Sequence, residues 1–191
     1  SFGWPARGQS EHWPARPVRV FVPYAPGGST DISARLIGEK VSDALGQRLL
    51  VENRPGAAGN AGLQAGAQSA PDGYTIVVVT TGHAINMSLY KDPAFHSLGT
   101  LVPAALLTEN PIVFVVNPKL PVKTVPEFIA YAKTRPGAIN YASSGVGSTT
   151  HLAVEILATQ AGIKLTHVPY RGSGPGIADV IAGHVQMAID T

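Results

Sequence analysis

The sequence contains no cysteine in its 191 residues, which excludes disulfides, thiolate catalysis and cysteine metal sites. Charge is also scarce: 14% of the residues are charged, and 14 basic against 12 acidic side chains leave a formal net charge of +2. This near balance gives no electrostatic basis for binding nucleic acid. No apolar run approaches the roughly 18 residues of a membrane-spanning helix. No secretory leader is visible at Ser1, so an exported protein is expected here as a mature or trimmed chain.

Glycine and proline, in contrast, are abundant, with 21 and 16 residues, in a chain that is 45% hydrophobic. This composition predicts a globular protein with many turns rather than a helix bundle. In the first half, short β-branched runs alternate with helix-like segments. Strands are predicted at 18–22, 49–51 and 74–80, and helices at 29–46 and from about 60 to 69. Alternation of strand and helix predicts an α/β fold with a parallel sheet.

The second half repeats this alternation. Strands are predicted at 112–116, 139–142, 164–168 and 185–189, and helices at 124–134, around 152–157 and at 177–182. Before the first strand, residues 1–16 carry the repeat Trp-Pro-Ala-Arg twice. Its prolines disfavour regular structure, so we predict a disordered tail or a cloning remnant.

Familiar catalytic and metal-binding motifs are missing. None of the six histidines forms the i, i+4 pair of a zinc-binding helix, so each is predicted to be a surface or loop residue rather than a ligand. Neither the G-x-S-x-G nucleophile elbow nor the P-loop motif occurs. The sequence therefore predicts no metal, no cofactor and no catalytic residue.

Two loops share a design that suits anion binding. Residues 24–31 (YAPGGSTD) and 143–151 (SSGVGSTTH) each leave a predicted strand and enter a helix. Their glycines allow close backbone approach, and the helix N-termini add partial positive charge. Ordinary helix capping needs the same Ser and Thr residues. Both loops follow the carboxyl ends of strands, where open α/β sheets bind ligands, so we predict a binding role.

Two further predicted loops follow strands, at 81–83 and 170–172. Arg171 either grips a carboxylate through its guanidinium fork or is an ordinary surface arginine. Asp31 and Asp190 could order loops or accept hydrogen bonds from ligand N–H groups. For Asp31, stabilisation of the helix dipole is the simpler interpretation.

Several long segments resemble the periplasmic solute-binding proteins of the tripartite tricarboxylate transporter family, also called Bug proteins. The segments are WPARPVRVFVPYAPGGSTDISARLIGEKVSDALGQRLLVENRPGAAGNAG, APDGYTIVVVTTGHAINMSLY, ENPIVFVVNP, INYASSGVGSTTHLAVEIL and HVPYRGSGPGIADVIAGHVQMAID. The resemblance extends from Trp13 to Thr191. It implies a two-lobed Venus-flytrap α/β fold, with lobe one at 17–116 and lobe two at 117–191.

The resemblance also implies a function: capture of a small carboxylate between the lobes and its delivery to membrane permease subunits, in the periplasm and without catalysis. The ligand-binding positions it implies in the first lobe are Tyr24, Ala25, Pro26, Gly27, Gly28, Thr30, Asp31, Thr81, Gly82 and His83. Those in the second lobe are Ser144, Gly145, Thr149, Thr150, His151, Tyr170, Arg171, Gly172 and Asp190.

Members of this family run well beyond the position of Thr191, so the resemblance implies a fold that is incomplete at the C-terminus. The last helix of lobe two, the return hinge strand and part of lobe one are expected to be absent. Self-association through exposed apolar surfaces is then expected. Two alternative hypotheses are a sensory or assembly partner and a serine-dependent enzyme acting on a small carboxylic acid or ester. The enzyme would pair Ser29, Ser144 or Ser173 with His83 or His151.

Overall fold

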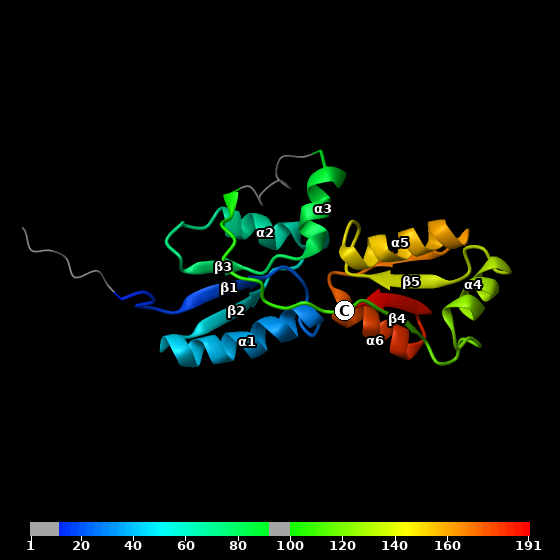
Figure 1. Ribbon diagram of the computed structural model, residues 1–191, viewed down its shortest axis with the longest axis horizontal. Helices are drawn as coiled ribbons and strands as arrows, with labels where there is room; N and C mark the ends of the chain where they lie inside the picture. Colours follow the sequence, from blue (N-terminus) through cyan, green and yellow to red (C-terminus); the bar gives the residue numbers. More distant parts are fainter. Residues whose placement is uncertain (1–11, 92–99) are drawn as a thin grey trace, which may run out of the picture.

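The computed structural model describes residues 12–91 and 100–191, and these form two α/β bodies joined near the middle of the molecule (Figure 1). We call residues 12–91 lobe one and residues 113–190 lobe two. Residues 102–112 carry neither helix nor strand and lead from one lobe to the other. The C-terminus lies at the junction of the lobes in Figure 1. Within the described residues, no helix is both long and apolar enough to cross a membrane.

Lobe one contains a three-stranded parallel sheet in the order β2-β1-β3, which confirms the parallel sheet predicted for this half. The strands are β1 (Val18–Val22), β2 (Leu49–Asn53) and β3 (Thr75–Val77). The helical segments are α1 (Ser29–Leu45), the 3-10 turn η1 (Ala57–Gly59), α2 (Asn60–Ala67) and α3 (Thr81–Leu89). All three strands therefore end at the same edge of the sheet, from which the loops of the candidate site emerge.

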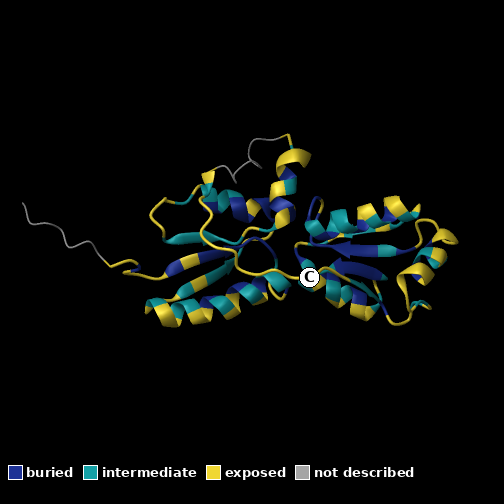
Figure 2. Ribbon diagram, viewed as in Figure 1, coloured by how far each residue is buried: buried dark blue, intermediate teal, exposed yellow. Residues whose placement is uncertain are grey.

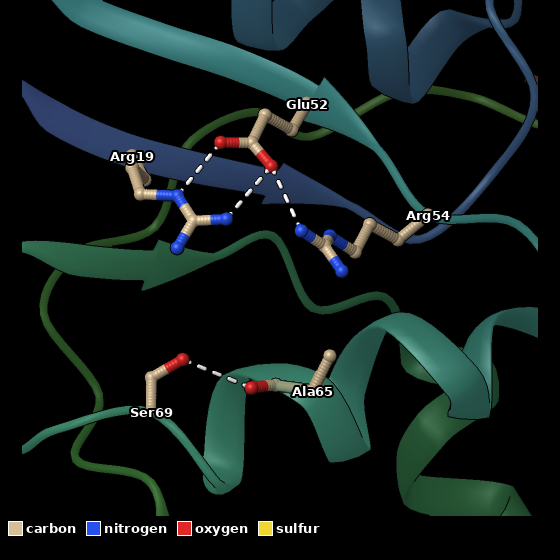
Figure 3. Close-up of polar contacts among 5 residues, drawn as sticks. All are labelled: Arg19, Glu52, Arg54, Ala65 and Ser69. Atoms are coloured by element: carbon tan, nitrogen blue, oxygen red, sulfur yellow. Dashed lines mark hydrogen bonds and ion pairs between the residues drawn. The ribbon is translucent and has the colours of Figure 1, made fainter.

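A polar network holds the edge of this sheet beside α2 (Figure 3). Arg19 donates to both carboxylate oxygens of Glu52 at 2.7 and 2.9 Å, and Arg54 donates to one of them at 3.0 Å. The hydrogen bonds from Arg19 lower the pKa of Glu52 to about 2. Both guanidinium groups also lie over the Phe21 ring. The network ties β1 to β2 and borders an open groove next to α2.

Gly66 sets how closely α2 packs on the sheet. A Cβ atom at Gly66 would lie 1.9 Å from Cγ2 of Val77 on β3. We expect Gly66→Ala to lower the free energy of unfolding by about 1–3 kcal/mol, because α2 must move away from β3. Urea denaturation measures this loss. The exposed Ala61 on the same helix provides a control, Ala61→Ser, which should change stability by less than about 0.5 kcal/mol. Equal effects of the two substitutions would contradict this packing.

Lobe two contains a four-stranded mixed sheet in the order β4-β7-β5-β6. Its strands are β4 (Val113–Val116), β5 (Asn140–Ser143), β6 (Thr166–Pro169) and β7 (Met187–Asp190). Strand β4 runs antiparallel to β7, whereas β5 is parallel to both of its neighbours. The predicted boundary at residue 116 is therefore corrected: β4 belongs to the sheet of lobe two, and lobe one ends before it.

Three helices cover this sheet: α4 (Val125–Lys133), α5 (Thr149–Ala161) and α6 (Ser173–Ala182). The buried residues of lobe two follow its strands and the inner faces of these helices (Figure 2). Phe128, Tyr141, Val154 and Met187 form the centre of the core and are fully buried. Thr124 caps α4 by accepting a hydrogen bond from the backbone N–H of Glu127 at 3.3 Å. The predicted capping box is only half formed, because the Glu127 carboxylate accepts from the backbone N–H of Lys123 rather than from that of Thr124.

Several predicted boundaries need correction. Strand β3 is shorter than the predicted 74–80, and β7 begins two residues after the predicted start at 185. Helix α6 starts at Ser173 rather than at Ile177. Its first turn contains Pro175, and proline is tolerated there because the N–H groups of a first turn have no intrahelical acceptor.

The predicted N-terminal tail is only partly described. Residues 1–11 lie outside the described residues. Trp13 packs against Tyr74, with ring centroids 6.3 Å apart, and Arg16 lies 4.1 Å from the centroid of the same ring. Arg16 also donates to Asp72 at 2.9 Å. Residues 13–16 are therefore docked on lobe one, in contrast to the prediction of a disordered segment.

Candidate functional site

The loop that follows β1 is held in place by Asp31. The backbone N–H of Gly27 donates to one Asp31 oxygen at 3.0 Å, and the side chains of Arg35 and Asn53 donate to the other at 3.0 and 2.9 Å. Burial of Asp31 acts to raise the pKa of its carboxyl, but these hydrogen bonds outweigh it, and the net pKa is lowered. Because Asp31 is only 4% exposed and satisfied by these partners, it orders the loop rather than facing a ligand.

Residues 81–83, predicted to form a loop, are the first turn of α3. The backbone N–H of Thr80 donates to Nδ1 of His83 at 3.0 Å, which closes a capping box at the start of the helix. His83 is fully buried, so its prediction as a surface or loop histidine was wrong. Burial lowers the pKa of His83, which keeps the imidazole neutral. The Tyr24 hydroxyl lies 3.0 Å from the Thr80 hydroxyl and links the loop after β1 to α3.

In lobe two, hydroxyl groups organise the loop before α5. Ser148 accepts a hydrogen bond from the backbone N–H of His151 at 3.2 Å and so caps the helix. Thr150 accepts from the backbone N–H of Ser144 at 2.9 Å and donates to the Ser144 hydroxyl at 3.2 Å. The backbone N–H groups in the first turn of α5 point out of the helix end and have no intrahelical acceptor. Capping therefore occupies only some of the hydrogen-bonding groups of this loop.

The two lobes touch through glycines, which bring the N-termini of their helices together. A Cβ atom at Gly82, in the first turn of α3, would lie 3.2 Å from the backbone nitrogen of Thr149 at the start of α5. A Cβ atom at Gly174, in the first turn of α6, would lie 2.8 Å from the carbonyl oxygen of Pro26. At both places the backbone of one lobe therefore approaches the backbone of the other more closely than a side chain at the glycine would allow.

Hydrogen bonds between the lobes, and from lobe one to the C-terminal Thr191, accompany these contacts. They join the Ala25 N–H to the Arg171 carbonyl at 2.8 Å, the Tyr90 hydroxyl to the Val146 carbonyl at 2.9 Å, and the hydroxyls of Ser29 and Thr191 at 2.6 Å. We call this arrangement, with the two lobes in direct contact, closed. The candidate site lies where the carboxyl ends of the strands from both sheets face each other.

A small cavity lies at this junction on the side of lobe two. Its lining includes the hydroxyl-bearing residues Ser143, Ser144, Thr150 and Ser173 and the carboxylate of Asp190. Ser173 donates a hydrogen bond to Asp190, but burial dominates and raises the pKa of this carboxyl. The cavity thus combines helix N-termini, hydroxyl groups and one acid.

Not every candidate residue reaches this junction with its side chain. Arg171 is exposed and contributes its backbone carbonyl to the contact with Ala25. The Tyr170 hydroxyl donates to Asp179 on α6; burial and this hydrogen bond raise the pKa of Tyr170 to about 12. Of the two interpretations of Arg171, the structure favours the ordinary surface arginine.

Two buried asparagines of lobe one were not singled out from the sequence. Asn60 and Asn86 are 3% and 0% exposed. A Cβ atom at Gly147 would lie 2.6 Å from Oδ1 of Asn86, so this side chain lies against the loop of lobe two. No motif marks Asn86, because its place against Gly147 depends on contact between segments far apart in the sequence.

Comparison with known proteins identifies the family. The model of the family described as "Tripartite tricarboxylate transporter family receptor" matches residues 33–191. The chain belongs to this family. Protein BugT of Bordetella pertussis is 38% identical to the receptor over 183 residues, which cover 95% of the chain and 56% of BugT.

Solved structures support the fold of the receptor. The periplasmic binding protein BugD superposes with a TM-score of 0.89 at 32% identity, over 93% of this chain and 60% of that chain. MatC from Rhodopseudomonas palustris, solved with bound malate, superposes with a TM-score of 0.87 at 34% identity, over 93% and 61% of the two chains. The fold is therefore that of a periplasmic binding protein. The chain spans little more than half of the length of these relatives.

The family and the fold are those of receptors rather than enzymes, and the structure gives the serine hypothesis no support. The hydrogen bonds among the described residues join none of Ser29, Ser144 and Ser173 to His83 or His151. A different pair does meet: the Ser143 hydroxyl lies 2.6 Å from Nε2 of His167. Burial, reinforced by His151, lowers the pKa of His167 to about 4. That pKa is far below the neutral range in which a general base works best.

His167 instead belongs to a stack of rings that supports the loop of lobe two. Its ring centroid lies 4.8 Å from that of Tyr141 and 4.2 Å from that of His151. Nδ1 of His151 accepts a hydrogen bond from the backbone N–H of Gly147 at 3.2 Å. Both imidazoles are neutral at pH 7, because burial lowers both pKa values.

Acidification should destabilise this stack. The pKa of His167 is about 4 in the folded receptor and about 6.5 in an unfolded chain. The unfolded state therefore binds more protons between these values, and stability falls as the pH decreases from about 6.5 to 4. We expect His167→Asn to reduce the loss of melting temperature between pH 7 and pH 5. The control is His184→Asn, at an exposed histidine, which should lose as much melting temperature between pH 7 and pH 5 as the unmodified receptor does. An equal loss in the unmodified receptor and in both variants would contradict the lowered pKa of His167 as the source of the acid sensitivity.

Proposed function

We propose that this receptor captures a small carboxylate between lobe one and lobe two in the periplasm and delivers it to membrane permease subunits. The observation that carries this proposal is the meeting of helix N-termini across the lobes. The first turn of α3 faces that of α5 at Gly82 and Thr149, and the first turn of α6 faces the loop before α1. Each lobe supplies half of the site.

The electrostatics of this arrangement suit an anion. Each helix N-terminus carries partial positive charge and N–H groups without intrahelical acceptors. Helices α1, α3, α5 and α6 all begin at the junction. The glycines and the Asp31-ordered loop keep these N–H groups close to the space between the lobes. A carboxylate there can accept hydrogen bonds from both lobes and thereby favour the closed arrangement.

The comparisons support both the ligand class and the compartment. MatC was solved with malate, a small carboxylate, and BugD is described as a periplasmic binding protein. Because the chain covers only 60% of BugD, ligand capture by these 191 residues alone is part of the proposal. The permease is proposed from the family description.

A thermal-shift screen tests the proposal. The panel contains small di- and tricarboxylates, aromatic acids and, as uncharged controls, the amides of the same acids. A carboxylate present at a hundred times its dissociation constant should stabilise the folded chain by about 2.7 kcal/mol. A cooperative melt that no carboxylate shifts would overturn ligand capture by this chain. A stable dimer with no ligand response would instead favour the assembly hypothesis.

A further inference from the structure

A short turn on lobe one, residues 72–74, holds the N-terminal segment 13–16, whose sequence is Trp-Pro-Ala-Arg. We call residues 72–74 the Tyr74 turn. The Trp13 ring packs against the Tyr74 ring, with centroids 6.3 Å apart. A Cβ atom at Gly73 would lie 3.1 Å from Nε1 of Trp13, so the missing side chain at Gly73 leaves room for the indole. The turn therefore accommodates an aromatic ring.

The backbone and the guanidinium of the same segment complete the contact. The backbone N–H of Ala15 donates to the Tyr74 hydroxyl at 2.9 Å. Arg16 donates to Asp72 at 2.9 Å, and its guanidinium lies 4.1 Å from the centroid of the Tyr74 ring, which is a cation–π contact. One aromatic ring, one backbone N–H and one cation, at a fixed spacing, are therefore the groups that the Tyr74 turn binds.

The same four residues occur a second time in the chain, at 4–7, nine positions before 13–16. Trp4 and Trp13 are the two tryptophans of the sequence, and each begins one repeat. Residues 4–7 lie outside the described residues. Their sequence nevertheless supplies each group that the Tyr74 turn binds, in the same order and at the same spacing.

The repeat at 4–7 is close enough along the chain to reach the Tyr74 turn. The ten residues 8–17 separate it from Val18 at the start of β1, a length that allows the chain to leave the turn as a loop and return to the strand. Closing a loop of ten residues disfavours this arrangement by roughly thirtyfold. That cost agrees with the presence of 13–16, which needs no loop, on the turn.

We propose that the Tyr74 turn is a binding site for the Trp-Pro-Ala-Arg motif and that residues 4–7 of the same chain are its second occupant. The two repeats exchange on one site, and each exchange shifts the N-terminal segment by nine residues. When 13–16 cannot bind, 4–7 takes its place. The Tyr74 turn directly precedes β3, whereas the candidate site lies at the carboxyl ends of the strands, so the exchange is independent of carboxylate capture.

Quenching of tryptophan fluorescence by acrylamide tests the exchange in the full chain. In Trp13→Ala, Trp4 is the remaining tryptophan, and we expect the Tyr74 turn to shield it. Trp13 is 45% exposed on the turn, so adding Tyr74→Ala should raise the quenching constant of Trp4 by the factor that separates such an indole from a fully exposed one. Trp4→Ala provides the reference, because Tyr74→Ala should there release Trp13. Equal quenching of Trp4 with and without Tyr74 would overturn the exchange.

Two further variants of Trp13→Ala test recognition of the motif and leave the Tyr74 turn itself unaltered. Arg7→Glu places a carboxylate where the motif supplies the cation for Asp72, so Trp4 should be quenched as strongly as in the presence of Tyr74→Ala. Gln9→Glu, which lies just outside the repeat, is the control and should leave Trp4 shielded. Equal quenching of Trp4 in these two variants would show that the turn does not recognise the motif.

Discussion

Gly174→Ala should weaken carboxylate binding by about ten- to hundredfold without preventing either lobe from folding. A Cβ atom at this position would lie 2.8 Å from the carbonyl oxygen of Pro26 and 3.2 Å from the backbone nitrogen of Gly28. These are backbone atoms of a loop that Asp31 holds in place, so the closed arrangement must open. The overpacking costs the closed arrangement about 1–3 kcal/mol, and this free energy corresponds to the expected ten- to hundredfold loss of affinity.

The substitution separates closure from folding. Alanine favours a helix over glycine by about 1 kcal/mol, so α6 itself is not weakened. The exposed Ala178→Ser on the same helix is the control and should keep the affinity of the unmodified receptor. Calorimetric titration together with ligand-free melting curves checks both claims. Undiminished affinity of Gly174→Ala would show that binding does not need this contact between the lobes.

Phe128→Ala should destabilise lobe two by about 3–5 kcal/mol, the range for removing a large aromatic side chain from a core. Phe128 is fully buried, and its ring meets that of Phe114 edge to face with centroids 4.9 Å apart. Lobe one has its own sheet, so we expect urea unfolding followed by circular dichroism to show an earlier transition for lobe two alone.

The matched control for Phe128→Ala is Val125→Ala on the same helix. Val125 is 40% exposed, and its truncation should cost less than about 1 kcal/mol. Loss of lobe two would also abolish ligand binding, because α5 and α6 belong to it. A single unshifted transition in Phe128→Ala would contradict the existence of a separate core in lobe two.

The architecture was largely predictable because its determinants are local. Three local signals each place the end of an element: the Val18–Val22 run, the glycine stop at Gly46 and the Thr124 side-chain cap. The antiparallel pairing of β4 with β7 was not predicted. Those strands are more than 70 residues apart in the sequence, and neither carries a local mark of its partner.

The site was predictable to the level of its loops. The glycine and hydroxyl patterns at 24–31 and 143–151 indicated both regions, and the structure brings them to one junction. What each side chain does there depends on tertiary contacts. The Asp31 carboxylate accepts hydrogen bonds from Gly27, Arg35 and Asn53. The sequence does not reveal those partners. The burial of His83 and Asn86 likewise follows from packing between distant segments.

Hydrogen exchange with and without a saturating carboxylate tests the central claim most directly, because it locates the ligand by its effect on backbone N–H groups. The account predicts slower exchange on both lobes at once, in peptides covering 25–32, 81–84, 144–151 and 171–175. Helix α4, far from the junction in Figure 1, should exchange as before. Protection confined to one lobe, or no protection in these four segments although the ligand binds, would contradict capture between the lobes.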